Sequence, residues 1–116
     1  MQIITSVTDQ PKQQFNLKLD NNERATMRLY YYESQNSWYF DIEYNGRINN
    51  GNKVVLTFNA LRHLKRLLPF GISFISESNA GPFSLDAFTS GKVVMILLNQ
   101  EDVNLIEETV YNESAK

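Results

Sequence analysis

The 116-residue sequence contains no cysteine and only one histidine, His63. Without cysteine the chain has no disulfide framework, no thiolate nucleophile and no zinc finger. A transition-metal site would have to combine this single imidazole with carboxylates, which is a poor set of ligands. We therefore expect the chain to hold neither a metal nor a cofactor.

Long apolar runs, proline and glycine are also scarce. No run approaches the roughly 20 apolar residues that a membrane helix needs. With three Pro, five Gly and 42% hydrophobic residues, the composition is that of a globular protein rather than a disordered or fibrous one. The N-terminus has no basic segment followed by an apolar stretch, so we expect no signal peptide and no membrane partner.

The net charge of −2 is unevenly distributed along the chain. Residues 1–66 hold nine basic and six acidic side chains, whereas residues 67–116 hold two basic and seven acidic ones. This difference is compatible with ordinary solubility, and also with a particle that stacks on unlike faces.

Most segments alternate apolar and polar residues, a pattern typical of half-buried antiparallel strands. Asn45-Gly46 is a type I′ hairpin signal, and the apolar run 92–98 indicates a central strand covered on both faces. A loop is predicted at 78–82 and an irregular flap at 83–91. Strands are expected at 14–19, 24–33, 38–44, 47–52 (short, with a loop), 53–58, 72–77 and 92–98.

One segment has helical periodicity. Asn59 is a suitable N-cap, the leucines of 60–68 fall on one arc, and Pro69 and Gly71 end the segment. The fold class predicted is therefore mainly β, a small antiparallel β-barrel or sandwich with one short α-helix at about residues 59–68. Residues 1–99 are expected to form a single β-rich domain, and 100–116 an acidic C-terminal extension that is partly frayed.

Catalytic signatures are missing from the sequence. It has neither a Gly-x-Ser-x-Gly nucleophile elbow nor the glycine spacing of a phosphate loop. Asp41 and Glu43 share a strand face about 7 Å apart, but such pairs are common on solvent-facing sheets. We expect a protein that is not an enzyme.

Tyrosines on the strands 24–33 and 38–44 must in part point out of the core, because side chains alternate along a strand. Exposed tyrosines could stack on single-stranded nucleic acid or on a carbohydrate. They could equally form a protein contact surface, or simply stabilise the sheet as cross-strand pairs. The net charge and the absence of a basic stripe disfavour nucleic acid.

Four segments follow one another in a particular order: Phe15-Asn-Leu-Lys-Leu19, Trp38-Tyr-Phe-Asp-Ile42, Leu68-Pro-Phe-Gly71 and the apolar run from Val93 to Leu98. Their order and spacing resemble the phage baseplate plug proteins, small structural proteins of contractile-tail phages. The resemblance spans about residues 14–99, and the acidic tail after Gln100 is longer than the family pattern implies. The positions that carry it are Phe15, Leu17, Trp38, Tyr39, Asp41, Leu68, Pro69 and Gly71.

The resemblance implies a non-enzymatic component of a phage or prophage-derived tail baseplate, similar to the central plug near the tube and hub. It implies a place in the virion tail after synthesis in the bacterial host cytoplasm, with other tail and baseplate proteins as partners; self-association stays open. The alternative is a small β-barrel that binds single-stranded nucleic acid or carbohydrate through exposed tyrosines. The residues expected to contact partners are Tyr30, Tyr32, Tyr39, Arg62, Lys65 and Arg66.

Overall fold

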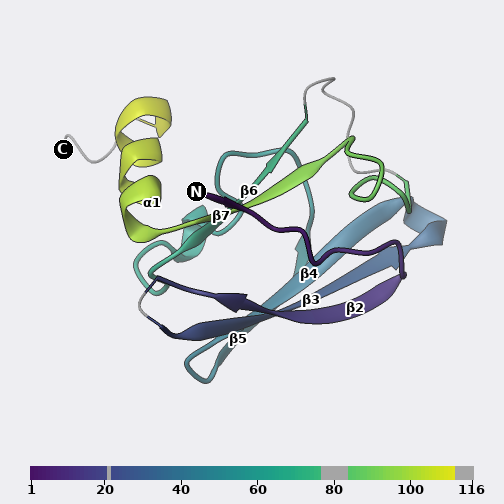
Figure 1. The fold of residues 1–116 in the computed structure, drawn as a ribbon, viewed down its shortest axis with the longest axis horizontal. Helices are drawn as coiled ribbons and strands as arrows, with labels where there is room; N and C mark the ends of the chain where they lie inside the picture. Colours follow the sequence, from purple (N-terminus) through teal and green to yellow (C-terminus); the bar gives the residue numbers. More distant parts are fainter. Residues whose placement is uncertain (21, 77–83, 112–116) are drawn as a thin grey trace.

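The computed structural model describes residues 1–20, 22–76 and 84–111, which form two antiparallel β-sheets and one short α-helix (Figure 1). One sheet has the strand order β2-β3-β4-β5 and the other the order β1-β7-β6. The predicted mainly β fold is confirmed, and the described strands form two sheets rather than a closed barrel. In chain order the elements are β1 (Gln2–Ile3), β2 (Lys12–Lys18), β3 (Arg24–Tyr32), the 3₁₀-helix η1 (Glu33–Gln35), β4 (Ser37–Tyr44), β5 (Arg47–Lys53), the 3₁₀-helix η2 (Arg62–Leu64), β6 (Gly71–Ile75), β7 (Val94–Leu98), α1 (Gln100–Ile106) and the π-helical turn η3 (Glu107–Tyr111).

The four-stranded sheet is a meander of neighbouring hairpins, as local alternation predicts. Buried and less buried residues alternate along β4 from Trp38 to Tyr44, and in the register Phe40 lies opposite Leu29. Asn45 and Gly46 both have positive φ, 52° and 79°, which is the conformation a type I′ turn requires. The following strand, β5, is a full seven residues, longer than the short strand and loop expected there.

The two sheets share one core. The rings of Phe40 in β4 and Phe74 in β6 have centroids 5.7 Å apart, and both side chains are fully buried. Trp38 is also fully buried, and its Nε1 donates a hydrogen bond of 3.0 Å to the backbone oxygen of Ser84. This bond ties the irregular segment 84–91 to the four-stranded sheet. The loop predicted at 78–82 lies outside the described residues.

The α-helix predicted at 59–68 is wrong: the segment consists of turns around the three-residue 3₁₀-helix η2. Its start is tied to β6, because the Ala60 N–H donates to the Ile72 oxygen at 2.7 Å, and Leu68 is fixed in the core. A 3₁₀-helix rises about 2.0 Å per residue and an α-helix about 1.5 Å. For the same number of residues, 3₁₀ turns therefore span a longer distance between the two fixed ends than an α-helix would. Asn59 still bonds the start of the segment, because its Oδ1 accepts from the Leu61 N–H at 3.0 Å.

The strand predicted at 53–58 is also wrong. β5 ends at Lys53, and the rest of the segment contributes only an isolated bridge between Thr57 and Phe74. Val54 is buried in the core and Val55 is exposed. From here the chain leaves the four-stranded sheet, and Thr57 reaches β6 at the edge of the three-stranded sheet. The segment is a crossing between sheets.

The only described α-helix is α1, which lies in the acidic C-terminal segment. Asn99 and Asp102 form a reciprocal capping box at its start, with bonds of 2.8 and 3.1 Å. Val103 and Ile106 are buried against Leu98 at the end of β7. Residues 112–116, where fraying was expected, lie outside the described residues. None of the described helices is long and apolar enough to cross a membrane.

Candidate protein contact surfaces

Three predicted contact residues form a cluster on the outer face of the four-stranded sheet. Tyr30 and Tyr32 come from β3 and Tyr39 from β4, where Tyr30 and Tyr39 are register partners. The rings of Tyr30 and Tyr39 stack with centroids 6.1 Å apart, and Tyr32 packs at 5.5 and 5.4 Å from the two. The alternation of β3 places Tyr30 and Tyr32 on the side opposite the buried Leu29, and register pairing with Tyr30 places Tyr39 there too. The tyrosine cluster is therefore a surface feature built by strand register.

Two hydroxyl groups of the cluster are engaged within the chain. Tyr30 donates to Asp41 Oδ1 at 2.9 Å, and Tyr39 donates to Gln35 Oε1 at 2.6 Å. Burial, with the hydrogen bond to Asp41 and the charge of that carboxylate, raises the pKa of Tyr30 to about 12. Tyr30 therefore stays a neutral donor at any physiological pH. Tyr32 is 47% exposed and is the member of the cluster most open to a partner.

The carboxylates Asp41 and Glu43 each have local partners on the same face. Asp41 also accepts from the Gly51 N–H at 2.8 Å, and Glu43 pairs with Arg28 at 3.2 Å. These contacts fix the outer face of β3, β4 and β5 rather than assembling a pair of facing acids. Within the described residues, no group of three or more His, Asp or Glu side chains is placed to hold a metal ion.

The predicted basic contacts lie in a different environment. Arg62 Nε and Lys65 Nζ donate to the two carboxylate oxygens of Glu107, at 2.9 and 2.6 Å. The guanidinium of Arg62 also lies 3.9 Å from the ring centroid of Tyr111. The structure thus uses two of the three cations to hold the C-terminal segment, and leaves Arg66 exposed.

Glu107 was not singled out by sequence reasoning, yet its side chain is only 6% exposed. Burial raises the pKa of Glu107, but the hydrogen bonds and charges of Lys65 and Arg62 outweigh it, so the pKa lies below its ordinary value. A signal was present in the sequence: Glu107 follows Val103 by four residues, on the face of the helical segment that packs inward. A carboxylate at an apolar helix position indicates a buried ion pair.

The positions that carry the resemblance are mostly structural. Leu17, Trp38 and Leu68 are in the core, and Phe15 is half-buried against it. Gly71 is required by close packing, because a Cβ there would lie 2.6 Å from Asn59 Oδ1. Tyr39 and Asp41, in contrast, belong to the tyrosine cluster and its neighbours, and Pro69 lines a hollow at the base of α1.

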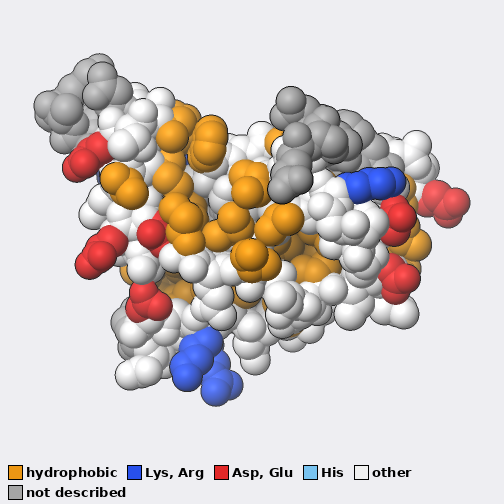
Figure 2. All heavy atoms as spheres, turned by 45° about the horizontal axis from the view of Figure 1, so that its top comes forward, with side chains coloured by type: hydrophobic (Ala, Val, Ile, Leu, Met, Phe, Trp, Pro, Cys, Tyr) orange, Lys and Arg blue, Asp and Glu red, His pale blue; other side chains and the backbone are white. Residues whose placement is uncertain are grey.

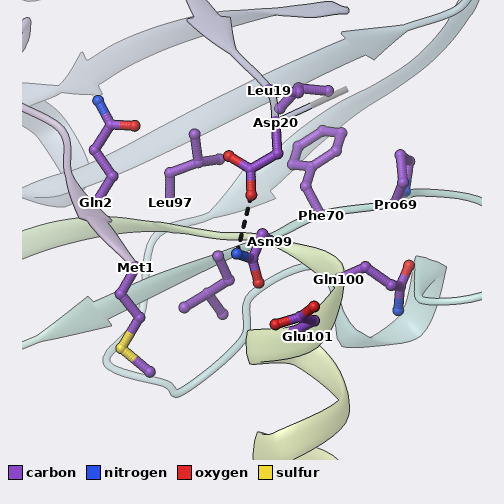
Figure 3. A pocket seen from close by; sticks show the side chains of 11 residues that line it. Met1, Gln2, Leu19, Asp20, Pro69, Phe70, Leu97, Asn99, Gln100 and Glu101 are labelled. Carbon is purple, nitrogen blue, oxygen red and sulfur yellow. Dashed lines mark hydrogen bonds between the residues drawn. The ribbon is translucent and has the colours of Figure 1, made fainter. Parts of the chain in front are cut away.

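That hollow, of about 540 Å³, lies where the three-stranded sheet meets α1 (Figure 3). Leu97 and Phe70 provide apolar walls, and Asp20 points across it to accept a hydrogen bond of 3.0 Å from Asn99 Nδ2. This bond links the turn after β2 to the helix cap. The hollow is thus part of how α1 is attached.

Comparison with known proteins identifies the family. The family model described as the cyanophage baseplate Pam3 plug gp18 matches residues 1–100. Among curated proteins, none matches the chain. The matched residues include both sheets and end at the first residue of α1. The chain belongs to the phage baseplate plug family, structural components of the virion tail.

Proposed function

We propose that this chain is the central plug of a contractile-tail baseplate, seated near the tube and hub, and that it acts by contact rather than by catalysis. The match to the plug family over residues 1–100 carries this proposal. The aromatic surface described above supports it, because tyrosine and arginine are enriched where proteins contact one another.

The tyrosine cluster is the proposed contact with one baseplate neighbour. Tyr32 offers an exposed ring, and its partners Tyr30 and Tyr39 are held in place by hydrogen bonds to Asp41 and Gln35. Such a preorganised aromatic surface loses little side-chain entropy on binding. Arg62, Lys65 and Arg66 remain proposed contacts with a second neighbour: Arg66 is exposed, and Arg62 and Lys65 are 31% and 29% exposed while paired with Glu107.

The alternative, a barrel that stacks nucleic acid bases or sugars on the same tyrosines, is less well supported. The rings of the cluster pack on one another, and the carboxylates of Asp41 and Glu43 lie on the same face. Carboxylates repel phosphate groups, so a strand of nucleic acid gains little here. Oligonucleotide titration at low and moderate salt gives the discriminating measurement: salt-dependent micromolar binding would contradict the plug role.

Cryo-microscopy of purified tail particles tests the position directly. We expect density for this chain on the tail axis between the tube and the hub, with the tyrosine cluster against a neighbouring protein. In parallel, Tyr32→Ala is expected to lower the amount of the chain recovered in purified tails. Leu67→Ala, at a side chain that is 51% exposed, is the matched control and should leave it unchanged. A cluster that faces only solvent in the particle would refute the proposed contact.

A further inference from the structure

The outer face of the three-stranded sheet is largely apolar, although Ser73 of β6, which is buried, lies on it opposite Ile96. In β7 the alternate residues belong to the shared core, which leaves Val94, Ile96 and Leu98 directed to the other side. The register sets Ile75 of β6 opposite Val94, and Ile3 of β1 opposite Ile96. Cross-strand partners share a face of the sheet, so the flanking strands extend the same apolar surface.

The chain itself covers only one end of this face. Val103 and Ile106 of α1 pack on Leu98, with Ile96 at the margin of that cluster. Beyond the helix, among the residues that the structure describes, Ile3 is 60% and Ile75 39% exposed, whereas Val94 and Ile96 are half-buried. A continuous apolar strand is typical of burial on both faces. In β7 one face packs in the shared core, whereas α1 covers only part of the other face.

Figure 2 shows this surface as a hydrophobic band that runs from α1 across the three-stranded sheet. Val110 of η3 is 43% exposed and follows Ile106 by four residues, so it continues the side of the helix that packs on the sheet. Large exposed apolar bands on a monomer mark sites of protein interaction. We call this surface the sheet–helix face; its members are Ile3, Ile75, Val94, Ile96 and Val110.

The exposed carboxylates of α1 and η3 lie at one end of the sheet–helix face, where Asp102 is paired with the Met1 amine at 2.8 Å. Figure 2 shows acidic side chains gathered at the α1 end of the hydrophobic band. Residues 84–111 contain one lysine, Lys92, and the acidic residues Asp86, Glu101, Asp102, Glu107 and Glu108. The last carboxylates of α1 and η3 differ in their roles, since Glu107 is held by cations whereas Glu101 and Glu108 are exposed.

We infer that the sheet–helix face docks a second baseplate protein through an apolar segment of that protein flanked by lysine or arginine side chains. The inference rests on the proposed baseplate role. An apolar centre calls for an apolar partner surface, and an acidic rim favours a basic one. Two copies of this chain facing each other here would bring two acidic helices to one interface, and like charges oppose that arrangement. The tyrosine cluster lies on the outer face of the other sheet, so the plug would contact neighbours through two faces.

Substitution in assembling tails tests the inference. We compare Ile3→Lys with the control Leu67→Lys, because the two side chains are 60% and 51% exposed and Leu67 belongs to neither the sheet–helix face nor the tyrosine cluster. Thermal unfolding of each purified variant checks that the fold is retained. Ile3→Lys should reduce the chain recovered in purified tails by roughly tenfold or more, as loss of an interface anchor does. Leu67→Lys should leave recovery unchanged.

A photo-cross-linking residue in place of Ile3 identifies the partner without depending on the lysine variant. In assembled tails we expect an adduct with a tail protein, whose cross-linked peptide is apolar and flanked by Lys or Arg. Equal recovery of the two lysine variants, an adduct with a second copy of this chain, or a peptide with acidic flanks would overturn the inference. In each of these cases the chain is still present in tails, so the proposed function stands; absence of the chain from tails would refute both.

Discussion

Replacement of Glu107 by glutamine should destabilise the chain by about 1–2 kcal/mol. Glu107 receives hydrogen bonds from Arg62 and Lys65 at 2.9 and 2.6 Å, and a hydrogen bond to a charged group contributes about 1.5–3 kcal/mol. The two cations are 31% and 29% exposed and regain some hydration when the carboxylate is lost. Glutamine also keeps one acceptor oxygen, so the expected loss is about one third of the roughly 3–6 kcal/mol that two such bonds contribute.

The change is measured by thermal and urea unfolding at pH 7. For a chain of this length, 1 kcal/mol corresponds to roughly 4 °C in Tm, so Glu107→Gln should melt about 4–8 °C below the wild type. Glu108→Gln is the matched control, because the neighbouring carboxylate carries the same charge but is exposed. The control should stay within about 0.5 kcal/mol of the wild type.

The pH dependence gives the sharper criterion. Because the pKa of Glu107 is lower in the folded chain than its ordinary value of 4.5, its contribution is present above that pH. The contribution is lost as the pH falls through the folded pKa. The difference between wild type and Glu107→Gln should therefore shrink below pH 4.5. Equal melting of the Glu107 and Glu108 variants, or a difference that does not change with pH, would refute the buried ion pair.

Three further substitutions test other parts of the structure. Gly71→Ala sets a methyl group against Asn59 Oδ1 and should cost about 2–3 kcal/mol in urea unfolding; wild-type stability would contradict the close approach. Trp38→Phe removes the bond to the Ser84 oxygen as well as buried volume, and should cost about 2–3 kcal/mol and alter the near-ultraviolet circular dichroism. Tyr30→Phe should abolish the tyrosine that titrates near pH 12 in absorbance. It should also flatten the fall in stability between pH 10 and 12, where only the unfolded chain releases that proton; an unchanged titration would exclude Tyr30 as its source.

The four-stranded sheet could be predicted because its determinants are local. The alternation of apolar and polar residues along β3 and β4 determines which side chains face the core, and Asn45-Gly46 determines the position of the hairpin turn. The same parity correctly directed Tyr30 and Tyr39 outward, which is why the tyrosine cluster could be anticipated from the sequence.

The segment 59–68 could not be predicted in the same way, since its conformation depends on distant contacts. A helical wheel shows the spacing of the leucines, but it cannot show the hydrogen bond between Ala60 and Ile72 that holds one end of the segment. The wheel also contains Arg62 and Lys65 but not Glu107, which follows them by 45 and 42 residues. Contacts between residues far apart in the sequence therefore explain why the helix prediction failed, and they also determine the partners of Arg62 and Lys65.

The pairing of β1 with β7 has a consequence for how the chain folds. Ile3 pairs with Ile96, so the first strand meets its partner only when most of the chain has been synthesised. The meander β2 to β5 consists of sequence neighbours and can form earlier. Contacts between distant residues slow folding, because the closing of the long loop precedes the gain from pairing. We expect a fast phase for the meander and a slower one in which β7 joins β1, so that β1 remains unpaired and vulnerable to aggregation until β7 has left the ribosome.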